Sequence, residues 1–189
     1  MKLYVIKRAL VLMTLLSSTA FASTVMGLSD EDIIARAQYI MKGTVSSIYT
    51  TIEKAGTPFQ YITIDIQKLY KNDPSSPLYE LDKIVIRQMG GTANNVTLDI
   101  DSLQKFTEGS EVFVSVKQDR NGYYYVIGNS QGLYKIVNEK LINNTQDAGT
   151  AFVRQGESGQ IVFEPGKIKE IKMEQMQKKL DAATSREEF

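Results

Sequence analysis

One stretch in the middle of the chain decides the fold, and it reads Tyr61-Ile62-Thr63-Ile64-Asp65-Ile66-Gln67-Lys68-Leu69-Tyr70. Its three isoleucines fall on one side of an extended chain, while the polar residues between them fall on the other. Strands alternate in this way when one face of an antiparallel sheet is buried. The stretch therefore predicts a strand whose isoleucines lie in a core.

Further strand-like segments lie on both sides of this stretch. β-branched and aromatic residues fill residues 39–52, where Gly43 predicts a bulge in mid-strand. Shorter strands are predicted at 83–89, 96–100, 112–116, 123–127 and 133–137. Asn121-Gly122, placed between two of these runs, is typical of a β-hairpin. Six or seven short strands favour a small antiparallel OB-like barrel, since closure removes exposed sheet edges.

Both ends of this barrel carry additional elements. Ser29 is a suitable N-cap for a short helix, and the three acidic residues after it favour the positive helix end. Beyond a polar connector at 138–150, residues 152–154 and 160–163 predict a second hairpin, and residues 167–182 predict a helix. We therefore expect a mainly β fold: a barrel over residues 23–138 and a C-terminal extension over 139–189 made of a hairpin and a helix.

The first 22 residues predict a cleaved signal peptide. Lys2, Lys7 and Arg8 precede an apolar run at 9–16, and Ala20-Phe21-Ala22 fits the site that signal peptidase cuts, after Ala22. The run is too short to span a bilayer, which takes about 20 apolar residues. We expect the mature chain in the periplasm or outside a bacterial cell, with no later segment that spans a membrane.

Composition excludes several chemistries. The chain has 22 Lys+Arg, 22 Asp+Glu, and neither Cys, His nor Trp. A Ser-His-Asp triad, a thiol nucleophile and a His- or Cys-ligated metal are therefore excluded. Without the three basic residues of the signal, 19 basic residues face 22 acidic ones, a net charge of −3, which argues against nucleic acid as a partner. We expect no enzymatic activity, no cofactor and no metal.

Several short motifs follow one another along the chain: a helix ending at Ala37, the apolar-apolar-x-Gly-x-Val segment of residues 40–45, Leu69-Tyr70-Lys71-Asn72, Gly90-Gly91, the Phe106-x-x-Gly109 turn, and Gln131-Gly132 before the last strand. In order and spacing, these motifs resemble those of a family of uncharacterised exported bacterial small β-barrel proteins. The resemblance covers residues 28–138 and implies an OB-like barrel without an established activity. A distant resemblance to netrin/TIMP-like barrels implies no zinc-chelating inhibition, because those inhibitors use an N-terminal Cys and the predicted mature terminus is Ser23.

Four tyrosines are candidate ligand-binding residues: Tyr61, Tyr123, Tyr125 and Tyr134. OB-folds bind glycans, peptides or single strands on such aromatic surfaces, although cross-strand packing of aromatic rings explains the same residues. Asp99 and Asp101 are predicted on one face of a strand, either as a carboxylate pair or as a solvated strand end. Asp119-Arg120-Asn121-Gly122 resembles part of a calcium loop, but a hairpin turn accounts for it without a metal.

These observations favour an exported, non-enzymatic binding or adaptor module. Its partner would be an envelope or extracellular protein, or a glycan, recognised through barrel loops. A protease inhibitor acting through a rigid loop at residues 71–80 or 90–95 is the alternative. A hydrolase that uses Asp and Glu alone is a third hypothesis.

Overall fold

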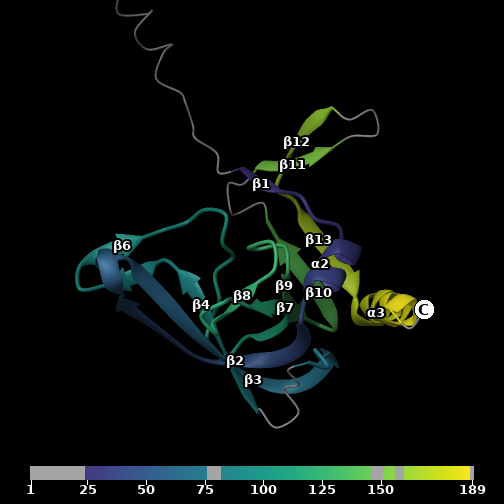
Figure 1. Cartoon of the computed structure of the whole chain (residues 1–189), viewed down its shortest axis with the longest axis horizontal. Helices are drawn as coiled ribbons and strands as arrows, with labels where there is room; N and C mark the ends of the chain where they lie inside the picture. Colours follow the sequence, from purple (N-terminus) through teal and green to yellow (C-terminus); the bar gives the residue numbers. More distant parts are fainter. Residues whose placement is uncertain (1–23, 76–81, 146–150, 156–159, 188–189) are drawn as a thin grey trace, which may run out of the picture.

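A closed five-stranded β-barrel forms the centre of the computed structural model (Figure 1), which describes residues 24–75, 82–145, 151–155 and 160–187. The barrel strands are β2 (Tyr39–Ile52), β3 (Pro58–Lys71), β4 (Lys83–Met89), β7 (Glu111–Gln118) and β8 (Tyr124–Val126). They follow the order β7-β2-β3-β4-β8, and a β7–β8 pairing closes the ring. This is the OB-like barrel that the sequence predicts. The predicted signal segment, residues 1–22, lies outside the described residues.

The barrel interior holds the first hydrophobic core. Ile62 and Ile64 of β3 are completely buried, as their alternation predicts, and Ile66 packs against them while only partly buried. The core is completed by Tyr39, Met41 and Val45 of β2, Ile84 and Ile86 of β4, Val112, Val114 and Val116 of β7, Val126 of β8, and Leu133. Burying each large apolar side chain contributes about 1.5–3 kcal/mol, so this core is the main stabilising element of the barrel.

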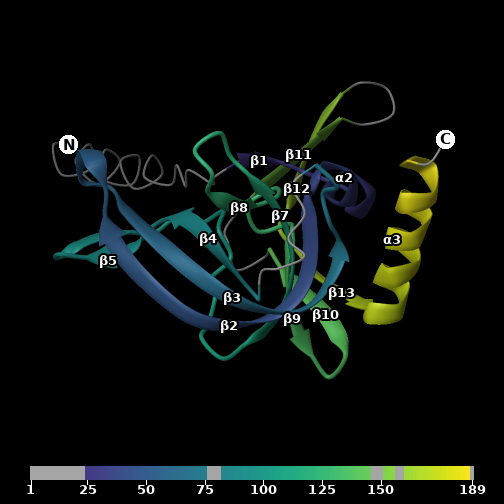
Figure 2. The ribbon, with the colours of Figure 1, turned by 60° about the horizontal axis from the view of Figure 1, so that its bottom comes forward.

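Gly43 explains how two 14-residue strands curve around this core. A Cβ atom at Gly43 would lie 2.4 Å from the backbone oxygen of Asp65, so only glycine permits the close approach of β2 and β3. The register shifts between Lys42 and Gly43, which confirms the predicted bulge. Figure 2 shows the resulting curvature of both strands along the length of the molecule.

A second hydrophobic core lies beside the barrel. The strands β9 (Leu133–Val137), β10 (Lys140–Asn144) and β13 (Ile168–Lys172) continue the sheet from β7, while α2 (Asp30–Arg36) and α3 (Met173–Glu187) pack against it. The core residues are Ile33, Ile34, Ala37, Ile40, Phe113, Ile127, Tyr134, Leu141, Ile171, Met176 and Leu180. Strands on both sides of the predicted boundary at 138/139 therefore share one sheet and one core.

Two small sheets complete the described chain. The predicted C-terminal hairpin is present as β11 (Ala151–Gln155) and β12 (Ile161–Pro165), and β1 (Thr24–Met26) runs parallel to β11. This sheet projects from the body at the top of Figure 1. The strands β5 (Gly91–Ala93) and β6 (Val96–Leu98) form another small hairpin. A 3-10 turn, η1 (Lys54–Gly56), joins β2 to β3. Among the described helices, none is both long and apolar enough to cross a bilayer.

Three predicted elements differ from the structure. Residues 168–172 form β13 rather than helix, because pairing with β10 extends the sheet, and the helix begins at Met173. Residues 140–144, predicted as connector, form β10, where pairing between β9 and β13 outweighs a polar sequence. The strand predicted at 96–100 ends at Leu98, where its pairing with Gly91 ends.

Candidate functional site

An aromatic face lies on the outer surface of the barrel. We define it by six residues: Tyr49 on β2, Glu53 in the β2–β3 loop, Phe59 and Tyr61 on β3, Arg87 on β4, and Tyr123 in the β7–β8 loop. Alternation places Tyr61 outside because Ile62 and Ile64 point into the core. The register then puts Tyr49 opposite Tyr61 on one side and Arg87 opposite it on the other.

The rings of this face are packed against one another. The Tyr49 and Tyr61 rings stack with centroids 5.0 Å apart at an angle of 7°, and Tyr123 meets Tyr61 edge-on at 6.3 Å. The Arg87 guanidinium lies 3.7 Å from the ring centroid of Phe59 and 4.7 Å from that of Tyr123. Tyr49 is nevertheless 54% exposed and Tyr123 is 40% exposed. The face is therefore preorganised and open to solvent.

Glu53 joins the polar groups of the aromatic face. It accepts hydrogen bonds from Arg87 Nε at 2.7 Å, Arg87 Nη2 at 2.6 Å and the Tyr61 hydroxyl at 2.6 Å. The bonds from Arg87, then that from Tyr61, lower the pKa of Glu53 to about 2. The bond to Glu53, then burial, raises the pKa of Tyr61 to about 12. At neutral pH, one carboxylate and one guanidinium neutralise each other beneath the rings.

The β7–β8 turn positions Tyr123. The carboxylate of Asp119 accepts hydrogen bonds from the backbone N–H of Tyr123 at 2.9 Å and of Asn121 at 2.8 Å. These bonds, first that from Tyr123, lower the pKa of Asp119 against the opposing effect of burial. Gly122 has a φ of 85°, a conformation that favours glycine. These are the contacts of a hairpin turn, and the antiparallel β7–β8 pairing confirms the predicted hairpin.

The four candidate tyrosines lie in three places. Tyr61 and Tyr123 meet on the aromatic face. Tyr125 is 39% exposed and lines a cleft between β4 and β8. Tyr134 is buried in the second core. Sequence reasoning missed Tyr49, Phe59, Glu53 and Arg87. Alternation along β3 places Phe59 on the same side as Tyr61. Strand register and loop geometry bring Tyr49, Glu53 and Arg87 to the same face, and sequence periodicity does not predict either of them.

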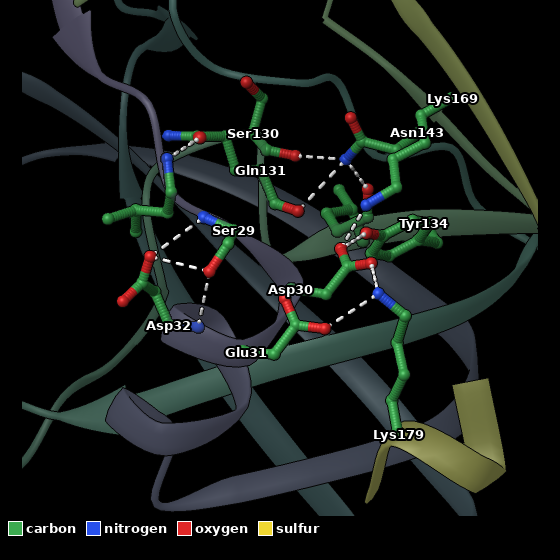
Figure 3. Close-up of polar contacts among 12 residues, drawn as sticks. Ser29, Asp30, Glu31, Asp32, Ser130, Gln131, Tyr134, Asn143, Lys169 and Lys179 are labelled. Carbon is green, nitrogen blue, oxygen red and sulfur yellow. Dashed lines mark hydrogen bonds and ion pairs between the residues drawn. The ribbon is translucent and has the colours of Figure 1, made fainter. Parts of the chain in front are cut away.

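Tyr134 belongs to a polar cluster around Asp30 (Figure 3). The Tyr134 hydroxyl donates to Asp30 Oδ1 at 2.9 Å, Lys179 Nζ donates to Oδ2 at 2.8 Å, and Lys169 also donates to Oδ1. Burial raises the pKa of Asp30, but the hydrogen bonds from the two lysines, the charge of Lys169 and the bond from Tyr134 outweigh it, so the pKa lies below its ordinary value. This Asp30 cluster joins α2, β9, β13 and α3 beside a cavity of about 410 Å³.

Further polar bonds fix the segment around this cluster. Ser29 caps α2, since its Oγ accepts from Asp32 N–H at 3.0 Å and Asp32 Oδ2 accepts from Ser29 N–H at 3.0 Å. Buried Asn143 donates to the backbone oxygens of Ser130 and Leu133, each at 2.7 Å. The donors around Asp30 are thus engaged in joining secondary-structure elements, which is a structural role.

Asp99 and Asp101 lie beyond the end of β6, not on one face of a strand as predicted. Asp99 forms an ion pair with Lys105 at 3.1 Å, and both side chains are mostly exposed. Within residues 24–75, 82–145, 151–155 and 160–187, no three acidic side chains converge as metal ligands do.

No model of a known protein family matches the chain, and no curated protein matches it either.

Proposed function

We propose that the protein is an exported, non-enzymatic binding module that recognises a protein or a glycan through its aromatic face. Export rests on the basic residues, apolar run and Ala20-Phe21-Ala22 site of the N-terminal segment. The proposal includes membership of the family of uncharacterised exported small barrels that the sequence resembles, and a location in the periplasm or outside a bacterial cell.

The position of the aromatic face in the barrel carries this proposal. OB-folds bind ligands on the face of their second and third strands, between the loop after strand 1 and the loop after strand 4. In chain order the second and third barrel strands are β3 and β4, which supply Tyr61 and Arg87. Glu53 lies in the loop after β2, and Tyr123 lies in the loop after β7. Apart from Tyr49 on the first barrel strand, the aromatic face thus coincides with the part of the fold that is suited to binding.

The chemistry of the face favours an uncharged or mixed ligand over a phosphate backbone. Its two charged side chains, Glu53 and Arg87, form a bidentate ion pair. Rings that are already packed against one another lose little side-chain entropy on binding. Exposed tyrosines offer a flat apolar surface and a hydroxyl, which suits a sugar ring or a peptide side chain.

Capture by the mature chain, residues 23–189, tests this function. Immobilised protein is exposed to bacterial envelope extracts and, separately, to a glycan array. We expect specific retention of a protein or a glycan, and loss of that retention in the double variant Tyr49→Ala with Tyr123→Ala. Phe163→Ala is the control, because Phe163 is an exposed ring on β12, outside the face. Equal retention by the double variant and the wild type would contradict the proposal.

One observation favours protease inhibition as a second candidate. The β5–β6 hairpin turns at Asn94 and Asn95, whose φ angles of 49° and 63° match a tight type I′ turn. The hydroxyls of Thr92 and Thr97 lie 3.0 Å apart across it, and it lies at one end of the molecule (Figure 2). Inhibition of one protease from a panel of serine, cysteine and metalloproteases, lost in Val96→Asp, would support this candidate. Of the other predicted loop, residues 76–80 lie outside the described residues.

A further inference from the structure

The barrel closes along one weak seam, between β4 and β8. A single pair, Ile86 with Tyr124, joins these two parallel strands. In contrast, β7 and β8 share three paired positions, and β3 and β4 share seven. β4 continues to Met89 beyond this pair, and no further bridge to β8 is present in the described part of the chain. The register with β3 turns the backbone groups of Gln88 toward Gln60, so the open edge beyond the Ile86–Tyr124 pair consists of the outward-facing backbone groups of Arg87 and Met89.

A cleft follows this open edge. Its volume is about 280 Å³, and its lining includes the apolar residues Met89, Leu103, Tyr125 and Val126 beside the polar residues Gln88 and Asn129. We call it the seam cleft. Pockets for small-molecule ligands occupy about 300–1,000 Å³, so the seam cleft is small for a complete ligand but sufficient for one side chain of a larger partner.

The seam cleft is continuous with the aromatic face. Arg87 lines the cleft and also stacks on Phe59 and Tyr123. Because Glu53 neutralises Arg87, the shared wall adds little net charge, which favours a neutral apolar side chain in the cleft. Met89 and Tyr125 are 43% and 39% exposed, so the entrance is accessible.

An open strand edge beside an apolar cleft is suited to a polypeptide. An added strand pairs its alternating N–H and C=O groups with the edge, and a pocket selects one of its side chains. A glycan has no such backbone. Building on the binding role of the aromatic face, we propose that the ligand is an extended segment of a partner protein. This segment pairs with β4 at Arg87 and Met89 and inserts one neutral apolar side chain into the seam cleft.

A library of random linear twelve-residue peptides, displayed on phage and selected on the mature chain, tests this inference. We expect enriched peptides to share one position occupied by Leu, Ile, Phe or Met. Synthetic peptides should bind Met89→Ser and Tyr125→Ser at least about tenfold more weakly than wild type, because each substitution removes a wall of the cleft. Methylation of a peptide backbone nitrogen next to the shared position should weaken binding by about tenfold as well, since it removes a pairing donor.

Val85→Ser is the matched control. Val85 is 41% exposed on the same strand but lies outside the cleft, so its substitution should leave peptide affinity within about twofold of wild type. Thermal unfolding of all three variants checks that they remain folded.

Two results would overturn the inference. In the first, no peptide is enriched on the wild-type chain relative to the immobilised Met89→Ser variant. In the second, the enriched peptides bind this variant and the wild type equally. If the peptide experiment fails but a glycan is captured in a way that depends on Tyr49 and Tyr123, the peptide inference alone is overturned. Peptide binding that depends on the cleft but not on these tyrosines supports the cleft and contradicts the role of the aromatic face.

Discussion

The molecule uses the same chemical arrangement twice, in two different environments. On the aromatic face, Glu53 accepts from the Tyr61 hydroxyl and from Arg87. In the second core, Asp30 accepts from the Tyr134 hydroxyl and from two lysines. Glu53 lies on the barrel surface, whereas Asp30 is only 5% exposed. A carboxylate that accepts from a tyrosine and a cation therefore positions exposed rings on the aromatic face, whereas in the second core it links secondary-structure elements.

The difference between the two sites comes from desolvation. Removing one partner from a buried ionic cluster leaves charge or donors without solvent, whereas water replaces a lost partner at the surface. The Asp30 cluster should therefore determine stability, and the Glu53 site should determine the orientation of binding residues. The following predictions test that division.

The largest expected effect is that of Asp30→Ala. It leaves Lys169 and the buried Tyr134 hydroxyl without their shared acceptor, while Lys179 keeps Glu31, and we expect the free energy of unfolding to fall by about 2–3 kcal/mol. Urea denaturation measures it. Asp99→Ala is the control, because its pair with Lys105 is exposed and contributes about 0–1 kcal/mol. A loss for Asp30→Ala no larger than that control would refute the structural role.

Acidification should reproduce part of this loss without a mutation. The folded-state pKa of Asp30 lies below its ordinary 3.8, so its contribution is present above that value and is lost as the pH falls through the folded pKa. For Glu53 the corresponding window lies between 4.5 and about 2. Urea denaturation at intervals from about pH 6 to about pH 2 measures both contributions. Because the pKa of Glu53 is lowered the further, we expect Glu53→Gln to flatten the pH dependence more than Asp30→Asn, although Asp30→Ala costs more at neutral pH; the reverse order would contradict this difference in pKa.

Removal of one tyrosine hydroxyl at each site gives a smaller and more specific contrast. Tyr134→Phe deprives a buried carboxylate of one donor and should lower the free energy of unfolding by about 1–3 kcal/mol. Tyr61→Phe leaves Glu53 bonded to Arg87 at a site near solvent, and should cost about 0.5–1.5 kcal/mol. Both substitutions preserve ring volume, so each serves as the control for the other in denaturation experiments. Equal losses would show that burial does not distinguish the sites.

The two tyrosines also show how far sequence reasoning reaches. Alternation in residues 61–66 predicts the strand and the core isoleucines, and thereby places Tyr61 outside. The same periodicity in residues 133–137 does not reveal a second core against which Tyr134 packs. That core forms because residues 168–172 add a strand to the sheet and α3 follows this strand. Both elements lie more than thirty positions after Tyr134 along the chain. Local pattern therefore predicts the barrel well, but the burial of Tyr134 depends on tertiary contacts.

The smallest expected effect on stability is that of Tyr49→Ala. Tyr49 is 54% exposed, and its ring covers one side of Tyr61 without a polar bond to the cluster beneath. Its loss should change the free energy of unfolding by no more than about 1 kcal/mol, while capture of the partner falls severalfold, because the stacked ring is the most exposed part of the aromatic face. Denaturation and capture are measured on the same preparation, with Phe163→Ala alongside. If instead the free energy of unfolding falls as far as in Tyr134→Phe while capture is unchanged, the aromatic face has a packing role like that of the Asp30 cluster. The two regions would then differ only in how deeply they are buried.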